Sequence, residues 1–541
     1  MKRFLLLSAC TLAFAPIAPT AAHEGEVSVE RLEADVKFLA DDSLEGREAG
    51  TPGFDLAAGY VAGHFAAVGL EPSANGTYFQ SIPFASYRSA GIEANTLEIE
   101  GIEGLGSLVA IEDYSASGSP RAMNGTVEGE LVFVGFGFAG HGYERDDFEG
   151  VDLEGKIAVL LRGAPDGLNT EEAAHFGSTQ GQRLSQHGAV AAVGLWSPAR
   201  ERNFPWEAAK QILATDSVSM TWIGPDHQVH SAAPNLKASV TLSPQISEAL
   251  FTGQPVSWQQ VIEAEADASK PLPSFALGAK ARINFANTME TIHSPNVIGV
   301  LPGSDPELAH EVVVVTAHLD HVGINPTEEE GDDEIYNGAM DNATGTAAIM
   351  EVARVLAKEP PRRTVLFLAL TAEEKGLRGS DYFARYPVLA DGQRVVANVN
   401  LDMPVLTFPF SEVVAFGAER STMFPIVQQA IANAGLTLTP DPLPEEGYFT
   451  RSDQYSFVKQ GIPAVYLDTG FGNGGDVAIP EFVSEHYHQP SDEAHRIDYA
   501  QLGRFTEVNV NVVKGVANMD EAPKWKKGDF FGTTFGGPME D

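Results

Sequence analysis

Residues 311–321, Glu-Val-Val-Val-Val-Thr-Ala-His-Leu-Asp-His, combine an apolar run with polar side chains at its end. The run Val312 to Val315 predicts a strand buried on both faces, because covered strands of a parallel sheet carry apolar residues at consecutive positions. His318 and Asp320 follow, and the two-residue period of a strand places them on the same side. We therefore expect a buried sheet with polar groups at the ends of its strands.

Strands and helices alternate around this stretch. The expected strands are 296–301, 312–316, 364–371, 395–401 and 464–467, and the expected helices are about 342–358, 379–385 and 423–434. Such alternation is typical of an α/β fold. It predicts a mixed, mostly parallel sheet with helices on both faces.

The first half of the chain has a different pattern. Residues 28–70 predict two amphipathic helices, whereas 98–240 contain short β-rich runs separated by Gly, Pro and Asp. A polar, Pro-containing stretch at 243–280 predicts a return linker. We expect a β-rich domain inserted into one α/β domain, with these boundaries: a signal peptide at 1–22, the first part of the α/β domain at 23–115, the insertion at 116–270, the catalytic part at 271–520 and a tail at 521–541.

The charge balance excludes several partners. The 541 residues include 74 acids and 35 bases, a formal charge of -39, and such a surface repels the phosphates of nucleic acids. No stretch after the amino terminus is apolar enough to predict a membrane span. The sequence does not predict an oligomeric state.

The amino terminus predicts export. Met1 to Ala22 has basic residues, then an apolar run, then small residues, which is the layout of a signal peptide. We expect a periplasmic or secreted protein. The one cysteine, Cys10, lies in this segment, and the apolar stretch before it is too short to favour a lipoprotein.

A glycine-rich motif, Gly135-Phe-Gly137-Phe-Ala-Gly140, matches the dinucleotide-binding pattern in spacing. The pattern requires a helix after the glycines, but 141–150 is acidic and non-periodic, so we expect no nucleotide there. Motifs of serine hydrolases and P-loop enzymes are missing from the sequence.

Acids and histidines follow the predicted strands. Because ligands bind beyond the carboxyl ends of strands in open α/β sheets, these groups are expected to converge. Five of them, two imidazoles and three carboxylates, are predicted metal ligands: His318, Asp341, Glu374, Asp402 and His488.

This ligand mixture suits zinc, with manganese or cobalt as substitutes. Asp341 has two carboxylate oxygens and can bridge two ions. Glu373 remains outside the ligand set and is the predicted general base.

These motifs resemble the bridged-dizinc (co-catalytic zinc) aminopeptidase family, which includes bacterial leucyl aminopeptidases, aminopeptidase Y and glutamate carboxypeptidase II. The matching stretches are His318-Leu-Asp320, Gly338-Ala-Met-Asp341-Asn342, Glu373-Glu374-Lys-Gly376, Asn400-Leu-Asp402-Met403 and Tyr487-His488. The resemblance implies an aminopeptidase with two zinc ions per chain, acting on peptides with a free amino terminus.

The same resemblance implies roles for individual residues. One zinc would take His318 and Asp402, the other Glu374 and His488, with Asp341 shared. Asp320, the second catalytic residue after Glu373, would be the partner of His318. The 116–270 region resembles a protease-associated domain in its Gly155-Lys-Ile157 and Gly188-Ala-Val stretches.

Three alternatives remain open at the level of sequence. The same fold could act as a carboxypeptidase, or as a glutaminyl cyclase with one zinc, and it could also serve as a non-catalytic binding protein. The complete set of acids and histidines argues against the last.

Overall fold

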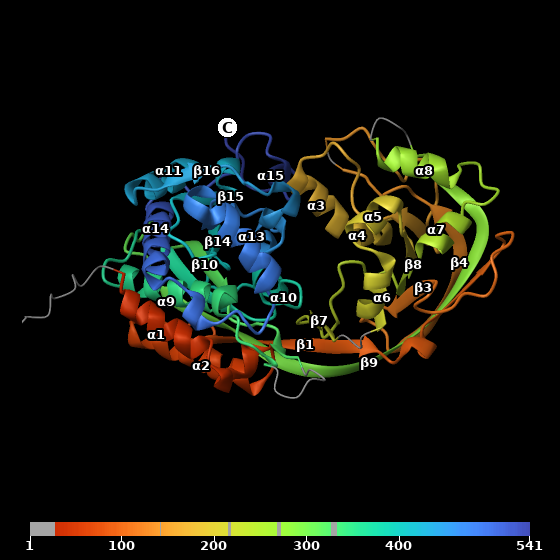
Figure 1. The fold of residues 1–541 in the computed structure, drawn as a ribbon. Helices are drawn as coiled ribbons and strands as arrows, with labels where there is room; N and C mark the ends of the chain where they lie inside the picture. Colours follow the sequence, from red (N-terminus) through yellow and green to blue (C-terminus); the bar gives the residue numbers. More distant parts are fainter. Residues whose placement is uncertain (1–26, 141, 215–217, 268–271, 326–332) are drawn as a thin grey trace, which may run out of the picture.

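The computed structural model describes residues 27–140, 142–214, 218–267, 272–325 and 333–541. Two lobes lie side by side and share one long strand (Figure 1). The predicted signal peptide at 1–22 lies outside the described residues. We name the lobes by their strands: the catalytic lobe holds β10 and β13 to β17, the inserted lobe holds β2 to β6 and β8, and β9 runs through both.

The catalytic lobe is built on a mixed, mostly parallel sheet, which confirms the predicted α/β fold. Its strands follow the order β16-β15-β17-β14-β10-β13-β9. The strands β10, β13, β14 and β17 run parallel to one another. Strand β15 runs parallel to β16 but antiparallel to β17, and β9 runs antiparallel to β13. The bounds are β10 Glu311–His318, β13 Thr364–Leu370, β14 Arg394–Asn400, β15 Glu412–Phe416, β16 Thr437–Thr439 and β17 Ala464–Thr469.

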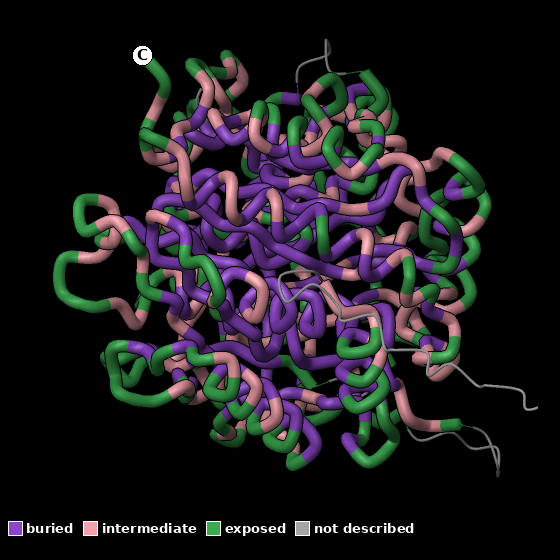
Figure 2. The backbone as a smooth tube through the Cα atoms, turned by 90° about the vertical axis from the view of Figure 1, so that its left-hand side faces the viewer, coloured by how far each residue is buried: buried purple, intermediate pink, exposed green. Residues whose placement is uncertain are grey.

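Every residue of β10 and β13 is buried, as the apolar runs predict. Helices cover both faces, and the strands occupy the buried centre of the lobe (Figure 2). One face packs on α1 Val29–Leu39, α2 Pro52–Ala67, α9 Thr344–Leu356, α11 Phe424–Asn433 and α14 Tyr499–Ala517. The other packs on α10 Arg378–Arg385 and α12 Gln454–Val458.

The inserted lobe is built on the other end of the sheet, which is flanked by helices. Its strands are β2 Thr96–Glu100, β3 Tyr114–Gly118, β4 Asn124–Phe133, β5 Ile157–Leu161, β6 Ala191–Leu195 and β8 Ala238–Leu242. Its helices are α3 Thr170–Ser178, α4 Gln180–Gln186, α5 Pro198–Asn203 and α6 Trp206–Ala214. Strand β5 is buried at every position.

One strand, β9 Phe275–Leu301, joins the two lobes. Its first part pairs with β2 and β4 of the inserted lobe, and its end pairs with β13. Between these, β9 pairs with β1 Phe79–Ser89, which itself pairs with β7 Ser219–Trp222. The lobes therefore share a continuous hydrogen-bonded sheet, visible as the long strand at the bottom of Figure 1.

The predicted linker at 243–280 is wrong. The segment contains α7 Pro244–Ala249 and α8 Trp258–Glu265, and it ends inside β9. The polar residues that suggested a linker act as helix caps: Ser243 accepts from the backbone of Ile246, and Ser257 forms a capping box with Gln260. Apolar residues of both helices pack into the inserted lobe.

The glycine-rich motif at 135–140 is held by an acid. The Asp147 carboxylate accepts the backbone N–H groups of Phe136 (2.9 Å) and Phe138 (3.1 Å). The backbone amides that would bind a phosphate are thus occupied by a negative side chain. This is consistent with the expectation, drawn from the sequence, that the motif binds no nucleotide.

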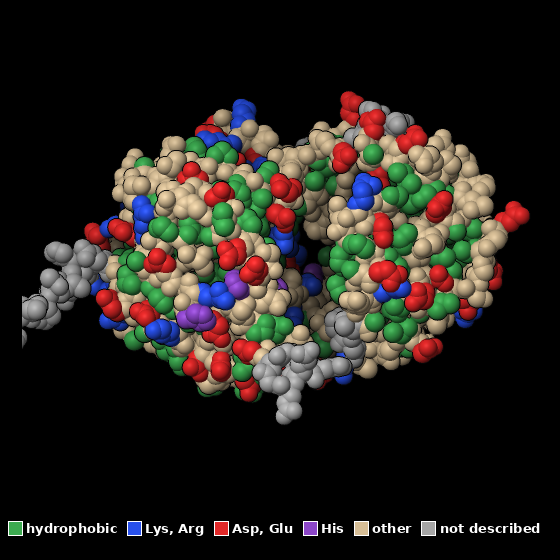
Figure 3. All heavy atoms as spheres, in the orientation of Figure 1, with side chains coloured by type: hydrophobic (Ala, Val, Ile, Leu, Met, Phe, Trp, Pro, Cys, Tyr) green, Lys and Arg blue, Asp and Glu red, His purple; other side chains and the backbone are tan. Residues whose placement is uncertain are grey.

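The last residues of the chain pack on the catalytic lobe. Trp525, and Phe531 of α15 Phe530–Thr534, are fully buried against Phe449 and Tyr455. No helix within the described ranges is long and apolar enough to cross a membrane. Figure 3 shows acidic side chains scattered over both lobes and a hollow between them.

Candidate metal centre

Asp341 lies at the centre of the predicted site. It belongs to a short π-helical turn, Ala339–Ala343, just before α9, and its carboxylate does not cap that helix. One carboxylate oxygen lies 3.1 Å from Nε2 of His318, and the other lies 3.1 Å from Nε2 of His488. Each oxygen of Asp341 therefore faces a different imidazole.

Each imidazole also contacts a second carboxylate. Nε2 of His318 lies 2.9 Å from Oδ1 of Asp402, and Nε2 of His488 lies 3.0 Å from Oε2 of Glu374. His318 ends β10, Asp402 follows β14, and Glu374 follows β13, so the parallel strands deliver these groups to one edge of the sheet. The structure brings all five predicted ligands together.

Three groups of side chains could each hold a cation; one combines His318 with Glu373 and Glu374, and the other two share Asp341. His318, Asp341 and Asp402 form the first of these two, with their potential ligand atoms within 4.8 Å of one another. The other contains Asp341, Glu374 and His488 together with His321. Asp341 is common to both, and nitrogen and oxygen donors of this kind fit zinc.

Sequence reasoning did not assign His321. Its Nδ1 lies 2.9 Å from Oε1 of Glu374, and the side chain is fully buried. Its Nε2 has no hydrogen-bond partner among the described residues. The residue stands directly after the His318-Leu-Asp320 motif, but a strand period does not indicate which way a side chain beyond the strand end points.

Asp320 holds the turn that carries the two glutamates. Its carboxylate accepts the backbone N–H groups of Glu373 (3.1 Å) and Glu374 (3.3 Å). Nδ1 of His318 faces the backbone carbonyl of Asp320 at 3.0 Å, not its carboxylate. Asp320 therefore contacts both His318 and Glu373, through different groups.

The electrostatics reflect a dense cluster of acids. Burial alone would lower the pKa of His318, but the carboxylates of Asp402 and Glu373 raise it well above its usual value. In the same way, hydrogen bonds to Asp341 and Glu374 outweigh burial and raise the pKa of His488 to about 10. Burial, with the neighbouring Glu374 and Asp402, raises the pKa of Glu373 well above its ordinary range. So many adjacent carboxylates favour the presence of cations.

Buried groups behind the site fix its loops. The Asp492 carboxylate accepts the N–H groups of Met340 (2.9 Å) and Asp341 (3.1 Å). The Asn342 side chain donates to the carbonyl of Leu401 (3.0 Å) and accepts from the N–H of Met403 (3.2 Å). These contacts tie the Asp341 turn to the Asp402 loop.

Arg47 joins the early loop to the site. It is buried, and its guanidinium donates to the backbone carbonyls of Leu319 (2.9 Å), Asn337 (2.7 Å) and Gly338 (3.0 Å). Burial lowers the pKa of Arg47 to about 10. The residue thus connects the loop after β10 with the turn before Asp341.

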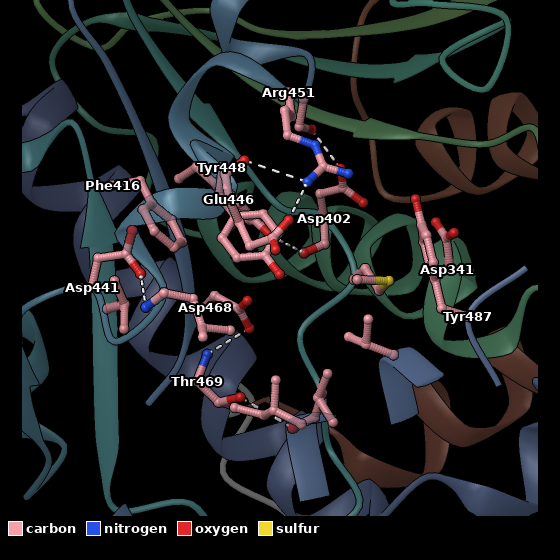
Figure 4. A pocket seen from close by; sticks show the side chains of 18 of the residues that line it. Asp341, Asp402, Phe416, Asp441, Glu446, Tyr448, Arg451, Asp468, Thr469 and Tyr487 are labelled. Atoms are coloured by element: carbon pink, nitrogen blue, oxygen red, sulfur yellow. Dashed lines mark hydrogen bonds and ion pairs between the residues drawn. The ribbon is translucent and has the colours of Figure 1, made fainter. Parts of the chain in front are cut away.

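A cavity of about 350 Å³ opens beside the cluster. His318, Asp341, Glu373 and Asp402 lie in its wall, with apolar and polar residues of the 403–487 region on the other sides (Figure 4). The site can therefore hold a small organic group next to the candidate ligands.

Comparisons with known proteins agree with this geometry. Residues 296–513 match the model of Peptidase family M28. Aminopeptidase YwaD of Bacillus subtilis is 28% identical over 233 residues, which are 43% of this chain and 46% of that protein. A probable zinc metalloprotease of Pyrenophora tritici-repentis is 37% identical over 124 residues, 23% of each chain. The chain thus spans less than half the length of these curated relatives.

A solved structure resembles the whole fold. An aminopeptidase from Aneurinibacillus sp. strain AM-1 is superposable with a TM-score of 0.50 at 21% identity, over 92% of this chain and 96% of that one. At this identity the likeness supports the fold. The matched segment 296–513 contains all five candidate ligands and Glu373. Residues 296–513 therefore resemble peptidase family M28, and the chain as a whole shares its fold with a solved aminopeptidase.

Proposed function

We propose that this protein is an exported zinc aminopeptidase that removes amino-terminal residues from peptides at a carboxylate-bridged dizinc site. The observation that carries the proposal is the placement of Asp341, whose two oxygens face His318 and His488 separately at 3.1 Å. A bridging carboxylate between two cation sites needs this arrangement.

Each candidate ligand has a place in the proposal. His318 and Asp402 would hold one zinc, Glu374 and His488 the other, and Asp341 both. His321 contacts Glu374 and would orient that carboxylate. When bound, zinc supplies Lewis-acid activation of the scissile carbonyl.

Glu373 is the proposed general base. It lines the cavity next to His318 and Asp402, and its backbone is fixed by Asp320. A high pKa suits a group that accepts a proton from water and then returns it to the leaving amine. Asp320 would act by positioning Glu373 and Glu374.

Three further parts of the proposal rest on the sequence. The layout of Met1 to Ala22 supports export to the periplasm or the medium. The β-rich insertion, proposed at 116–270, would be a protease-associated domain. The substrates would be peptides with a free amino terminus.

The test is hydrolysis of a peptide panel. The mature chain, loaded with zinc, is incubated with free-amine and amino-blocked peptides with and without chelator, and the products are followed by mass spectrometry. Stepwise, chelator-sensitive loss from free amino ends is expected, with two zinc ions per chain by elemental analysis.

Other outcomes would reject the proposal. Trimming from the carboxyl end would indicate a carboxypeptidase, and cyclisation of amino-terminal glutamine a glutaminyl cyclase. Peptide binding without cleavage would indicate a non-catalytic binder. One zinc per active chain would reject the bridged pair of ions but not the aminopeptidase activity.

A further inference from the structure

The cavity beside the metal centre has a mixed lining. One end is formed by candidate ligands, and the walls come from β15, β17, the loop 441–452 and α13 Gly475–Glu485. If the proposed function holds, the substrate's amino-terminal residue lies at the ligand end, so its side chain enters the cavity. The following inference rests on that function and concerns which side chain fits.

Most of the wall is apolar or aromatic. Phe416, Tyr448 and Tyr466 come from neighbouring segments, and the rings of Phe416 and Tyr466 stack at 5.2 Å. Aliphatic residues complete the lining: Val405, Val414, Leu443, Ile479 and Val483. Such walls favour a side chain with an apolar stem.

The same cavity contains an excess of negative charge. Its lining beyond the metal centre includes the carboxylates of Asp441, Glu446 and Asp468, and one guanidinium, that of Arg451. Arg451 is already paired with Glu446 at 2.8 Å. Among the described residues, Asp441 and Asp468 have no cationic partner, so the cavity has two uncompensated acids.

Asp468 is the better placed of the two. It lies on β17, is partly buried, and accepts the backbone N–H of Thr469 at 2.6 Å. Figure 4 shows it on the opposite side of the cavity from Asp341 and Tyr487. Asp441, in contrast, caps a turn by accepting the N–H of Leu443 at 2.8 Å.

We propose that this cavity binds the first side chain of the substrate and selects lysine or arginine, with Asp468 pairing with the cationic end. A partly desolvated carboxylate without a counter-ion is unfavourable, and a cationic side chain would supply one. A neutral side chain of equal length would leave Asp468 unpaired, which is the basis of strong discrimination by buried polar groups. The aromatic walls add cation–π attraction.

The test compares substrates matched in length. The zinc-loaded enzyme is assayed with lysyl, arginyl, norleucyl and glutamyl coumarin amides. We expect kcat/KM for lysyl to exceed that for norleucyl at least tenfold, and the Asp468→Asn variant to lower this ratio at least tenfold. Asp468→Glu should keep part of the preference, while Asp476→Asn, an exposed acid at the start of α13, should keep the full ratio.

Binding separates this inference from the proposed function. Titration calorimetry with lysinamide and norleucinamide measures the preference without turnover, and circular dichroism checks that each variant is folded. Equal binding of the two amides by the wild-type protein, or an unchanged ratio in folded Asp468→Asn, would overturn the inference. Selective binding of lysinamide without cleavage of any substrate would reject the aminopeptidase and keep the pocket assignment.

Discussion

Glu373 combines a fixed backbone with a side chain in the cavity wall. Its N–H is bonded to Asp320, and the side chain lies beside His318 and Asp402. Glu373 lies outside the proposed ligand set, so we expect that its charge can be removed without dismantling the metal site. This separates its contribution to catalysis from metal binding.

Glu373→Gln is expected to lower kcat by about a hundredfold to ten-thousandfold with zinc content unchanged. Loss of a general base costs about 10²–10⁴-fold, and glutamine keeps the size of the side chain. Steady-state kinetics and elemental analysis of the same preparation measure both quantities. Glu359→Gln, an exposed residue paired with Lys514, serves as the control. A variant that lost its zinc would instead make Glu373 a ligand.

Asp492 tests how the bridging carboxylate is oriented. Its two oxygens accept the N–H groups of Met340 and Asp341, so Asp492→Asn replaces one acceptor by a donor. We expect zinc affinity to fall about 10–100-fold, the usual effect of losing a group behind a ligand. Titration against a chromogenic chelator measures it.

The control for this experiment is Asp520→Asn, because Asp520 is almost fully exposed. If Asp492→Asn binds zinc as tightly as Asp520→Asn does, the orientation of Asp341 does not depend on Asp492.

At the residue scale, sequence reasoning predicted which side chains converge and named Asp320 behind them, but it did not find Arg47. The strand-end rule was sufficient for His318, Glu374 and Asp402, because parallel strands place their ends at one edge. Arg47 could not be found in this way, since it contacts backbone carbonyls nearly 300 positions away. Every residue has a backbone carbonyl, so the sequence does not indicate which carbonyls an arginine will contact.

At the scale of elements, a helix of the inserted lobe supports one wall of the cavity. α3 packs on the loop that contains Asp441, Leu443 and Tyr448, and Arg420 of the catalytic lobe donates to Glu171 of α3 at 2.8 Å. Gly447 lies at this contact with φ of 61°, where an added Cβ would be 3.0 Å from that of Ala174. The geometry of the wall thus depends on both lobes.

Gly447→Ala is expected to lower kcat/KM about fivefold. A left-handed backbone costs an alanine about 1 kcal/mol or more. A loop that is harder to order by about 1 kcal/mol weakens transition-state binding by the same free energy, which lowers kcat/KM about fivefold. Initial rates with a lysyl amide measure the effect. The control, Gly59→Ala, lies on an exposed part of α2 with open space around it.

Gly59→Ala should raise the free energy of unfolding by up to about 1 kcal/mol, because alanine is the better helix former. Its kcat/KM should not change. Equal kinetics for Gly447→Ala and Gly59→Ala would show that the α3 contact does not shape the cavity.

Element predictions succeeded where a pattern was local. The helix expected at 423–434 is α11 Phe424–Asn433, because apolar spacing defines it. The strand expected at 296–301 is only the end of the 27-residue β9. Most of β9 alternates buried and exposed residues and runs from one lobe to the other, and its partners are distant in sequence. Local patterns therefore could not show that the strand continues.

At the scale of the whole molecule, two histidines lie where the lobes meet. His175 of α3 bonds the hydroxyl of Tyr455 through Nδ1 and packs among the rings of Phe530 and Phe535. His230 stacks on Trp222 at 3.9 Å, and Trp222 donates to Asp381 of α10 at 3.0 Å. Both contacts join the segment 79–294 to the catalytic lobe.

These two histidines predict a loss of stability in mild acid. Burial lowers the pKa of His175 to about 4, with Arg183 and Lys459 adding to the effect. Burial also lowers the pKa of His230 to about 4, despite the nearby Asp381. An unfolded histidine has a pKa of about 6.5, so the unfolded chain binds more protons and stability falls as pH falls from about 6.5 to 4.

At pH 5 the expected loss is about 2 kcal/mol for each histidine. Urea unfolding at pH 7.5 and pH 5 measures the difference in unfolding free energy. His175→Gln cannot be protonated, so its pH dependence should be smaller than that of the wild type by about one histidine's share, whereas the exposed His310→Gln should match the wild type. Because the metal centre titrates equally in all three proteins, an identical pH dependence in His175→Gln would mean that protonation at this contact does not weaken the junction between the lobes.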